Sequence, residues 1–271
     1  MIIDFHTHAF PETLAPKALP VLASRVGYAP YGTGTAEDLI QKMDESGTDL
    51  SVVCNIATNP KQQTNVNNFA IETMEHYGSR LICLGSVHPA SDNIENELIR
   101  LKNAGIPGIK LHPDYMETTI DSPDFDPIFE KCTELGLFII IHAGFDVCSS
   151  KKVHASPDMI LRRLEKSPHI RLVCAHFGAN MMWDETEEKL CGKNLWIDTS
   201  MGVLEGLSKV QAKRIIEKHG SERVLFGTDF PWCDPKTNID YIKSLGLSDD
   251  ALEKIFFKNA EELLGLDKNN R

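Results

Sequence analysis

The sequence predicts a (β/α)8 barrel of the TIM-barrel class. Eight short apolar runs rich in β-branched residues recur at fairly even spacing, and helix-like segments separate them. Eight such units in about 250 residues match the size of this barrel. No Gly-x-Gly-x-x-Gly follows any run, which disfavours a doubly wound nucleotide-binding sheet. We therefore expect residues 1–271 to form a single barrel domain.

The first strand is predicted over the apolar start of the chain and the motif Asp4-Phe5-His6-Thr7-His8. A strand's period of two places Asp4, His6 and His8 on one face, with Phe5 and Thr7 on the other. Residues 9–34 then form a segment too long for a simple turn and rich in Pro and Gly. We expect a long lid loop there, over the C-terminal end of the first strand, so that the barrel is distorted.

The other seven strands and their helices follow in order. The predicted strands are residues 50–56, 81–87, 106–111, 137–141, 170–175, 195–198 and 223–227. Helices are predicted to begin after the N-cap residues Thr35, Ser91, Ser156 and Ser248, and to end at Gly47, Gly105, Gly136 and Gly220. A short closing helix is expected over residues 259–264, and a frayed end over residues 268–271.

Composition narrows the class of protein. The formal net charge of −11 and the pI of about 5.4 argue against a nucleic-acid partner, which normally needs a basic face. The seven cysteines are odd in number and never form a Cys-x-x-Cys pair, so neither a disulfide framework nor a cysteine zinc site is indicated. The chain shows no secretory leader and no apolar run of about 18 residues. We expect a cytoplasmic protein with no membrane partner.

Polar residues follow most of the predicted strands. In a barrel the C-terminal ends of the strands converge on one pocket. The residues found there are His6 and His8 (first strand), Lys110 and His112 (fourth), His142 (fifth), His176 (sixth) and Asp229 (eighth). Imidazoles and carboxylates are metal ligands and acid–base groups, so the sequence predicts a metal-dependent active site at this end. Three other histidines, His76, His169 and His219, lie in polar helical segments and are expected on the surface.

The motifs around these residues resemble the amidohydrolase superfamily, and more narrowly its amidohydrolase-related branch, which includes aminocarboxymuconate-semialdehyde decarboxylase-like enzymes. They are Asp4-Phe5-His6-Thr7-His8, Gly108-Ile109-Lys110-Leu111-His112-Pro113, Ile141-His142-Ala143-Gly144, Ala175-His176-Phe177-Gly178 and Gly227-Thr228-Asp229-Phe230-Pro231-Trp232. The resemblance implies a barrel in which His6, His8, His142 and Asp229 hold a divalent ion, most simply Zn²⁺. It also implies that His176 is the acid–base residue.

These assignments suit hydrolysis. A divalent ion held by histidines and a carboxylate activates a water molecule at neutral pH. Asp229 can contact the ion and take a proton, while His176 can polarise the substrate or return a proton to the leaving group. Asp4 is expected to orient an imidazole through a hydrogen bond. The leading hypothesis is a metal-dependent hydrolase of a small carbonyl, amide, ester or lactone substrate that uses metal-activated water.

Lys110 leaves two options open. In binuclear members of the superfamily a lysine on the fourth strand is carbamylated and bridges two ions, which would make a second metal ion here. Otherwise its ammonium group is a cation for an anionic substrate. His112 shares the face of Lys110 by the period of two and is assigned to the same duty.

The alternative hypothesis is non-oxidative decarboxylation of a small carboxylated ring or enol compound by the same ligands. Cations for its carboxylate could come from Lys17, Arg25, Lys110 or the pair Arg162-Arg163. A TatD-type deoxyribonuclease would want an acidic residue where Lys110 stands, and a non-catalytic scaffold would be expected to lack His176 or Asp229. The substrate is not named by the sequence, because specificity is expected in residues 9–34, 145–155 and 181–192. Oligomeric state is also open: a homodimer with Trp183 or Trp196 at its interface is one option.

Overall fold

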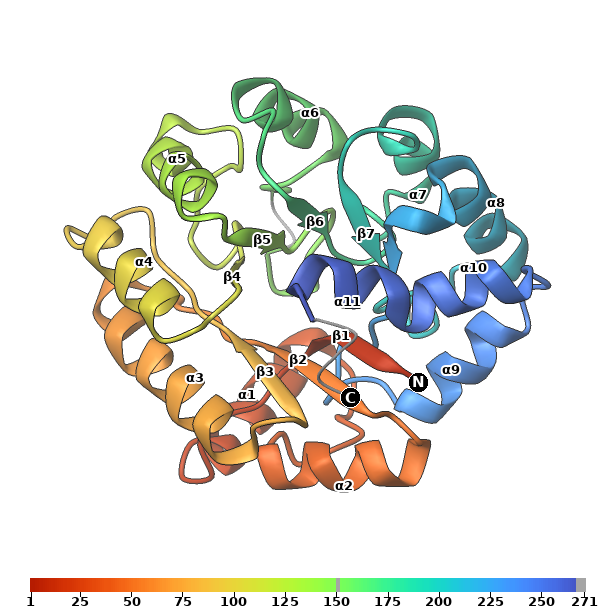
Figure 1. The fold of residues 1–271 in the computed structure, drawn as a ribbon, viewed down its shortest axis with the longest axis horizontal. Coiled ribbons are helices and arrows are strands. Elements are labelled where there is room, and N and C mark those ends of the chain that lie inside the picture. The colour runs from red at the N-terminus through yellow and green to blue at the C-terminus, as the bar shows by residue number, and fades with distance from the viewer. Residues whose placement is uncertain (150–151, 267–271) are drawn as a thin grey trace.

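The structure is a computed structural model that describes residues 1–149 and 152–266, and it shows a ring of parallel strands surrounded by helices (Figure 1). The strands are β1 (Ile3–Thr7), β2 (Leu50–Cys54), β3 (Leu81–Leu84), β4 (Gly108–Leu111), β5 (Phe138–Ile141), β6 (Leu172–Cys174), β7 (Trp196–Asp198) and β8 (Val224–Leu225). Each lies within or beside a predicted run. The frayed end expected over residues 268–271 lies outside the described residues.

Two sets of parallel strands close into the predicted barrel. Strands β1 to β3 pair in sequence order, as do β4 to β8. At one seam, Gly85 after β3 bridges to Ile109 of β4. At the other seam, Thr7 of β1 bridges to Phe230 after β8, and the backbone N–H of Phe5 donates to Phe226 O at 2.7 Å. Hydrogen bonds therefore join both pairs of edges, and the predicted fold class is confirmed.

Helices follow the strands, and most of them lie around the outside of the barrel (Figure 1). They are α1 (Ala15–Val26), α2 (Ala36–Ser46), α3 (Gln63–Tyr77), α4 (Ile94–Asn103), α5 (Asp126–Leu135), α6 (Pro157–Lys166), α7 (Trp183–Glu185), α8 (Lys209–His219), α9 (Pro235–Lys243), α10 (Asp249–Glu253) and α11 (Asn259–Leu264). Short 3₁₀ helices cover Pro60–Gln62, Pro123–Phe125, Val147–Ser149 and Ser221–Arg223, and π-helical turns cover Thr186–Leu190 and Lys254–Lys258.

Most of the predicted caps are present. The Thr35 side chain accepts from Asp38 N at the start of α2, and the Ser156 side chain accepts from Met159 N at the start of α6. The prediction that Ser91 caps α4 was wrong, because the N-cap residue of this helix is Asn93. The Ser91 hydroxyl instead accepts from the Asn93 backbone N–H, so it stabilises a turn before the helix rather than the helix itself.

The side chains of β1 do not alternate strictly between the two faces of the strand, although strict alternation was expected. Ile3 and Phe5 pack in a buried cluster with side chains from β2, β3, β5, β6 and β8. Phe5 therefore faces the interior although His6 also reaches the inside of the barrel, at the site described below. The register of β1 against β2 shifts between Asp4 and Thr7. Such an irregularity re-aims side chains, and this is how two adjacent residues both point inward.

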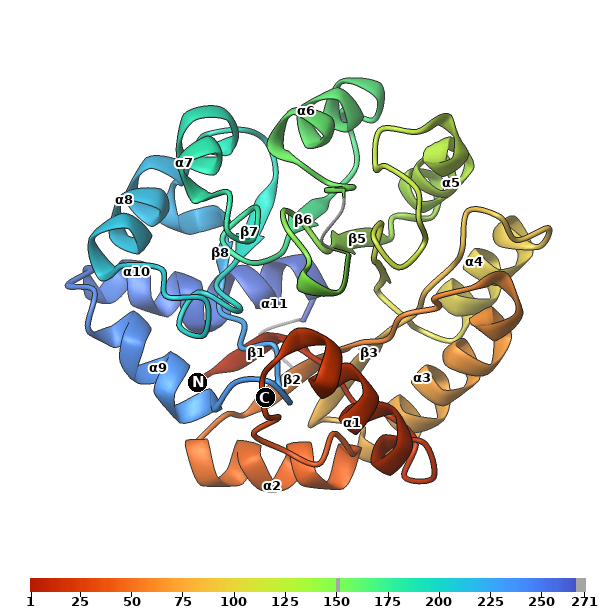
Figure 2. The ribbon, with the colours of Figure 1, turned by 180° about the vertical axis from the view of Figure 1, so that it is seen from behind.

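The two ends of the barrel are covered differently. Helix α11 crosses one end and adds Ala260 and Leu263 to the interior cluster (Figure 1), whereas α1 lies at the opposite end (Figure 2). Residues 9–34 form the predicted lid over the C-terminal end of β1, but the lid is not mainly a loop. Its central twelve residues form α1, whose buried Ala15 and Leu19 anchor it to the protein. Of its prolines, one lies in the first turn of the helix, where its missing N–H has no partner to lose, whereas Pro20 lies inside the helix.

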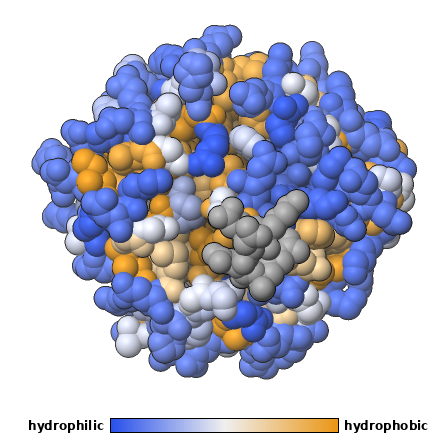
Figure 3. Space-filling model, viewed as in Figure 1, coloured by the Kyte–Doolittle hydropathy of each residue, from blue (hydrophilic) through white to orange (hydrophobic). Residues whose placement is uncertain are grey.

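On the surface, the face that carries α11 is hydrophilic around its rim, with apolar patches nearer the middle (Figure 3). No helix of the described residues is long and apolar enough to cross a membrane. Trp183 and Trp196 are only partly exposed, and each packs against a buried cluster. A homodimer through either tryptophan stays a prediction. All seven cysteines are free thiols.

His219 is buried, which corrects its expected place on the surface, while His76 and His169 are exposed as predicted. Its Nε2–H donates to Leu195 O at 3.0 Å, and its Nδ1 accepts from Gly192 N at 3.4 Å. The neutral ring thus satisfies both nitrogens. Burial lowers the pKa of His219 from 6.5 to about 4, although the hydrogen bond to Leu195 opposes the shift.

This shift predicts a pH-dependent loss of stability. Because the unfolded chain binds a proton more readily, the free energy of unfolding falls as the pH drops from 6.5 toward 4. Between about pH 7 and about pH 5 we expect His219 to account for a loss of about 2 kcal/mol. His219→Gln retains a donor and should remove that part of the pH dependence. Urea unfolding of the wild type and the variant at both pH values measures the change in the free energy of unfolding. The same pH dependence in both proteins would contradict this role of His219.

Candidate active site

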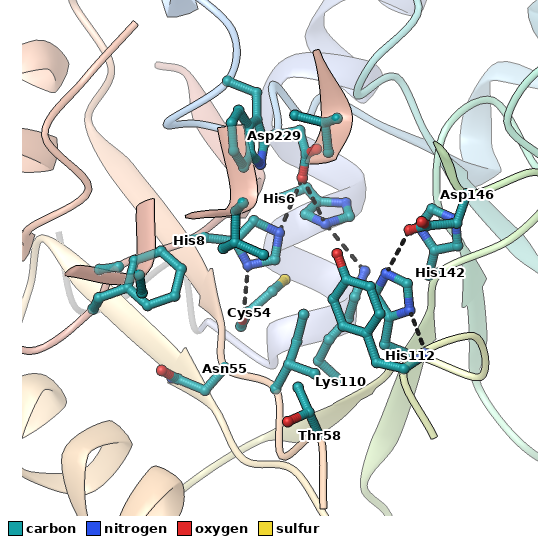
Figure 4. A pocket seen from close by; sticks show the side chains of 18 of the residues that line it. His6, His8, Cys54, Asn55, Thr58, Lys110, His112, His142, Asp146 and Asp229 are labelled. Atoms are coloured by element: carbon teal, nitrogen blue, oxygen red, sulfur yellow. Dashed lines mark hydrogen bonds and ion pairs between the residues drawn. The ribbon is translucent and has the colours of Figure 1, made fainter. Parts of the chain in front are cut away.

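A cavity of about 700 Å³ opens at the C-terminal ends of the strands, beneath α1. All seven of the predicted site residues line it: His6, His8, Lys110, His112, His142, His176 and Asp229. Figure 4 shows most of them pointing inward from different strands. Parallel strands bring their carboxyl ends to one edge, so residues more than 200 positions apart in the sequence meet here. The cavity is therefore the candidate active site.

Three predicted metal ligands lie closest together. The Oδ1 of Asp229 is 3.2 Å from His6 Nε2 and 3.0 Å from His8 Nε2. The ligand atoms of these three residues all lie within 4.8 Å of one another. Asp229 has a positive φ of 68° and sits at the turn after β8, where its backbone N–H donates to His6 O at 2.8 Å. This backbone hydrogen bond holds the carboxylate beside β1.

The other ring nitrogens fix the tautomers of His6 and His8. His6 Nδ1–H donates to Asp198 Oδ2 at 2.8 Å, and His8 Nδ1–H donates to Cys54 O at 2.7 Å. The Nε2 atoms are then left with lone pairs that face Asp229 Oδ1. Two lone pairs and a carboxylate oxygen at this distance repel one another unless positive charge lies beside them, and the Lys110 ammonium group, 3.1 Å from His6 Nε2, supplies part of that charge. Two imidazole nitrogens and a carboxylate oxygen are also donors that a divalent cation accepts, so this donor set fits one.

Electrostatics support neutral imidazoles at this site. Burial lowers the pKa of His6 well below its ordinary value, and the charge of Lys110 lowers it further. Burial alone would raise the pKa of Asp229, but the protonated forms of His6, His8 and His176 would outweigh burial and hold that pKa below its usual range, so the carboxylate ionises before these rings lose their protons. Neutral imidazole and ionised carboxylate are the forms that ligate metal.

Asp198 and Ser200 form a hydrogen-bonded pair that contacts both His6 and His176 and that was not predicted from the sequence. Asp198, at the end of β7, is fully buried, and besides His6 it binds the His176 backbone N–H through Oδ1 at 3.0 Å. Ser200 Oγ also bonds to Asp198 Oδ1 and lies 2.8 Å from His176 Nδ1. One carboxylate thus orients both a proposed ligand and the proposed acid–base residue. Asp198 ends a predicted strand, so the rule that located the other site residues could have found it.

Asp4 does not orient an imidazole, which corrects its expected role. Its carboxylate accepts from the Thr228 backbone N–H at 3.0 Å, from the Thr228 hydroxyl at 2.6 Å and from the His6 backbone N–H at 3.2 Å. Asp4 therefore holds β1 to the turn after β8. Burial raises the pKa of Asp4 to about 7, although the Thr228 hydrogen bond lowers it. The role expected of Asp4 belongs to Asp198.

His142 is the predicted ligand that lies apart from the others. Its Nδ1 is 3.0 Å from His176 Nε2, and it is not in the compact group formed by His6, His8 and Asp229. His142 Nε2 is buried without a hydrogen-bond partner among the described residues. A buried nitrogen with a free lone pair is costly, and a ligand or ion in the cavity would satisfy it. His142 as a fourth ligand stays a prediction.

A second donor group lies beside the first, at the ends of β4 and β5. Asp146 Oδ2 is 3.3 Å from His112 Nε2 and 3.9 Å from His142 Nε2. The two imidazoles stack at 4.2 Å with only 12° between their planes, and Tyr115 stacks on the other side of His112 at 3.7 Å. An imidazole lone pair lies in the ring plane, so stacked rings aim poorly at one ion. This geometry favours hydrogen bonding by Asp146, and a second ion here stays a prediction.

Only some of the cations expected to bind a substrate carboxylate line the cavity. Lys110 and Lys17 line the cavity, whereas Arg25 is exposed outside its lining. Arg162 and Arg163 do not line the cavity, and they form ion pairs with Asp121 and Asp126, respectively. Of the three expected specificity segments, residues 9–34 contribute ten residues to the lining, and the described part of residues 145–155 contributes Asp146 and Val147. Residues 181–192 contribute none.

Comparisons with known proteins agree with this architecture. The family model described as amidohydrolase matches residues 3–266. The 2-amino-3-carboxymuconate-6-semialdehyde decarboxylase of Dictyostelium discoideum is 22% identical over 98% of this chain and 92% of its own length. An uncharacterized TIM-barrel protein of Bordetella bronchiseptica has a TM-score of 0.77 at 20% identity, covering 97% of this chain and 98% of that one.

A third similar protein is a 5-carboxyvanillate decarboxylase of Novosphingobium aromaticivorans, solved with manganese and a nitrobenzoic acid. It has a TM-score of 0.74 at 18% identity, covering 98% of this chain and 96% of that one. At these identities the structural likenesses show the fold. Two of these three similar proteins are named decarboxylases.

Proposed function

The chain belongs to the amidohydrolase family, and from this premise we propose that it is a metal-dependent decarboxylase of a small carboxylated aromatic or enol compound. The names of two relatives support the reaction class, and the site residues fit it. Hydrolysis, the leading hypothesis from the sequence, becomes the outcome against which the proposal is tested.

The observation that carries the proposal is the environment of Lys110. The side chain is 1% exposed, and its Nζ lies 3.1 Å from His6 Nε2. Among the described residues no carboxylate forms an ion pair with it. A buried ammonium group without a counterion is unfavourable, and an anionic substrate entering the cavity would provide one. Lys110 therefore serves as a cation for a substrate carboxylate beside the metal ligands.

In decarboxylation the bond between the carboxylate carbon and the ring breaks. Its electron pair stays on the ring carbon, which takes one proton, and carbon dioxide leaves. A divalent ion held by His6, His8 and Asp229, with His142 within the same cavity, would supply positive charge that fixes the substrate oxygens. Zinc and manganese both accept imidazole and carboxylate ligands, and zinc stays our prediction for this chain.

The remaining residues position the substrate and handle the proton. Asp198 and Ser200 hold the Nδ1 side of His176, which leaves Nε2 on the side of His142. We assign to His176 the transfer of a solvent-derived proton to the ring carbon. Burial lowers the pKa of His176 to about 3, so its ring is neutral near pH 7. It takes up the solvent-derived proton only transiently and returns to the neutral form when that proton passes to the ring carbon.

The test is the fate of solvent atoms. The metal-loaded enzyme is supplied with a panel of hydroxybenzoates and, separately, with aryl esters and lactones. We expect carbon dioxide release from a hydroxybenzoate, solvent deuterium at the vacated ring carbon, and no solvent ¹⁸O in the organic product. Turnover confined to esters or lactones, with solvent ¹⁸O in the product, would show that the enzyme is a hydrolase.

Lys110→Met is the companion variant in this test. It should raise KM for the hydroxybenzoate substantially while the bound metal is retained, because an ammonium group is not a metal ligand and the variant keeps His6, His8 and Asp229. A carbamylated Lys110 would instead give a protein heavier by one carbon dioxide, and Lys110→Met would then lose metal. Mass spectrometry of the intact protein and elemental analysis of the variant distinguish the two roles. Lys61→Met, outside the cavity lining, is the control.

A further inference from the structure

The cavity has a second end, formed by two helices, that the proposed reaction does not need. Helix α1 with its N-cap lines the cavity with Leu14, Lys17, Ala18, Val21 and Leu22. This spacing of i, i+3, i+4, i+7 and i+8 is one face of a helix. Four of the five side chains are apolar. The lid therefore turns an apolar face toward the cavity.

Helix α3 presents a second face to the cavity, with two amide and two apolar side chains. Gln62, Asn65, Val66 and Phe69 also line the cavity, at positions i, i+3, i+4 and i+7. Val66 and Phe69 are only partly buried. The apolar side chains of the two faces thus border one space, with Gln62, Asn65 and Lys17 among them, and this space is continuous with the polar end that holds His8 and Lys110.

The volume exceeds what a single ring requires. An apolar cavity of about 150 Å³ holds a benzene molecule, and this cavity is about 700 Å³. Leu14 and Val21 are 46% and 50% exposed, although both line the cavity. Large apolar side chains exposed in a pocket gain free energy when an apolar ligand covers them.

We propose that the substrate carries an apolar substituent of several carbon atoms, which lies between α1 and α3 while its carboxylated ring occupies the polar end. This inference rests on the proposed function for the carboxylate, but the apolar subsite itself follows from the two helix faces. Lys17 is the one cation on the lid face, and the hydrogen bond from Tyr28 to Glu205 at 2.8 Å ties the end of the lid to the loop after β7. The subsite is thus built into a lid that is fastened at its far end.

The test is calorimetric binding of two homologous series to the metal-loaded enzyme. One series is 2-hydroxybenzoate with a 4-n-alkyl group from methyl to hexyl, and the other is the corresponding 3-n-alkylphenols, which lack the carboxylate and cannot be decarboxylated. We expect binding to tighten about two- to fourfold for each added methylene until the subsite is filled. We also expect each hydroxybenzoate to bind more tightly than its phenol.

The double variant Leu14→Gln/Val21→Asn should abolish most of the gain from the alkyl chain and leave the affinity for unsubstituted 2-hydroxybenzoate within about twofold. Val210→Asn is the matched control, because Val210 is 68% exposed on α8 and does not line the cavity. It should bind like the wild type. A gain with chain length that survives in the double variant would place the alkyl group elsewhere and overturn the proposal.

The two series separate this inference from the proposed function. If 2-hydroxybenzoate binds but chain length has no effect in either series, the apolar subsite is wrong and the proposed function stands. If chain length improves binding equally in both series and the carboxylate adds nothing, the apolar subsite stands and the proposed carboxylated substrate is wrong. If neither series binds, both are wrong.

Discussion

His6→Ala is expected to lose most of its bound divalent metal, with an affinity lower by more than about 100-fold, and with the metal its activity. Changes to residues that merely support a ligand already cost about 10- to 100-fold, and His6 Nε2 is one of the three donors gathered at Asp229. The barrel should stay folded, because Asp198 keeps its hydrogen bonds from the His176 N–H and the Ser200 N–H and hydroxyl.

Elemental analysis after dialysis and competition with a chelator measure this loss, and thermal unfolding of the metal-free proteins confirms folding. His88→Ala is the matched control, since His88 is a buried histidine outside the cavity lining. It should retain metal. We expect His142→Ala to behave like His6→Ala if His142 is the fourth ligand. Stoichiometric metal in His6→Ala would disprove the site.

The second large effect is expected for His176→Asn, which should keep its metal and lose turnover by about 100-fold or more, the usual contribution of a positioned proton-transfer group. His176 also stacks on His6 at 5.1 Å, but it is not one of the three donors gathered at Asp229. His6 should stay in place in the variant because its Nδ1–H still donates to Asp198. Single-turnover kinetics with the hydroxybenzoate found in the panel would separate chemistry from product release.

A buried histidine far from the cavity provides the control for this experiment. His219→Gln should turn over at the wild-type rate near neutral pH, because His219 lies at the end of α8 and hydrogen-bonds only to backbone atoms. If His176→Asn also ran at the wild-type rate, His176 would be structural. The solvent proton would then reach the ring carbon by another group.

Much of the fold could be predicted because local signals and barrel geometry agree. Apolar runs bounded by caps such as Thr35 and Ser156 located the strands and helices. The failures arose where side chains compete for local hydrogen bonds. Ser91 forms a turn with Asn93 before α4 begins, and the β1 register shift admits Phe5 and His6 to the same side. A period of two contains no information about such an irregularity.

The candidate site was predictable for the residues that end strands, because parallel strands must place those ends together. His6, His8, Lys110, His112, His142, His176 and Asp229 all line the cavity. Asp146 was not predicted, because it lies beyond the end of β5 in a loop whose path the sequence does not specify. His219 was misplaced for a related reason, since the Leu195 carbonyl that it reaches belongs to a distant segment.

Periodicity and strand order were enough to predict the class of fold, the end of the barrel that carries the chemistry and the types of side chain present there. Three features needed the folded structure: which nitrogen of each histidine faces Asp229, the orientation of His6 by Asp198 rather than Asp4, and the apolar helix face of the lid beside α3. Such facts depend on distances between side chains from different strands. Those distances are set by packing across the whole barrel, which no local pattern encodes.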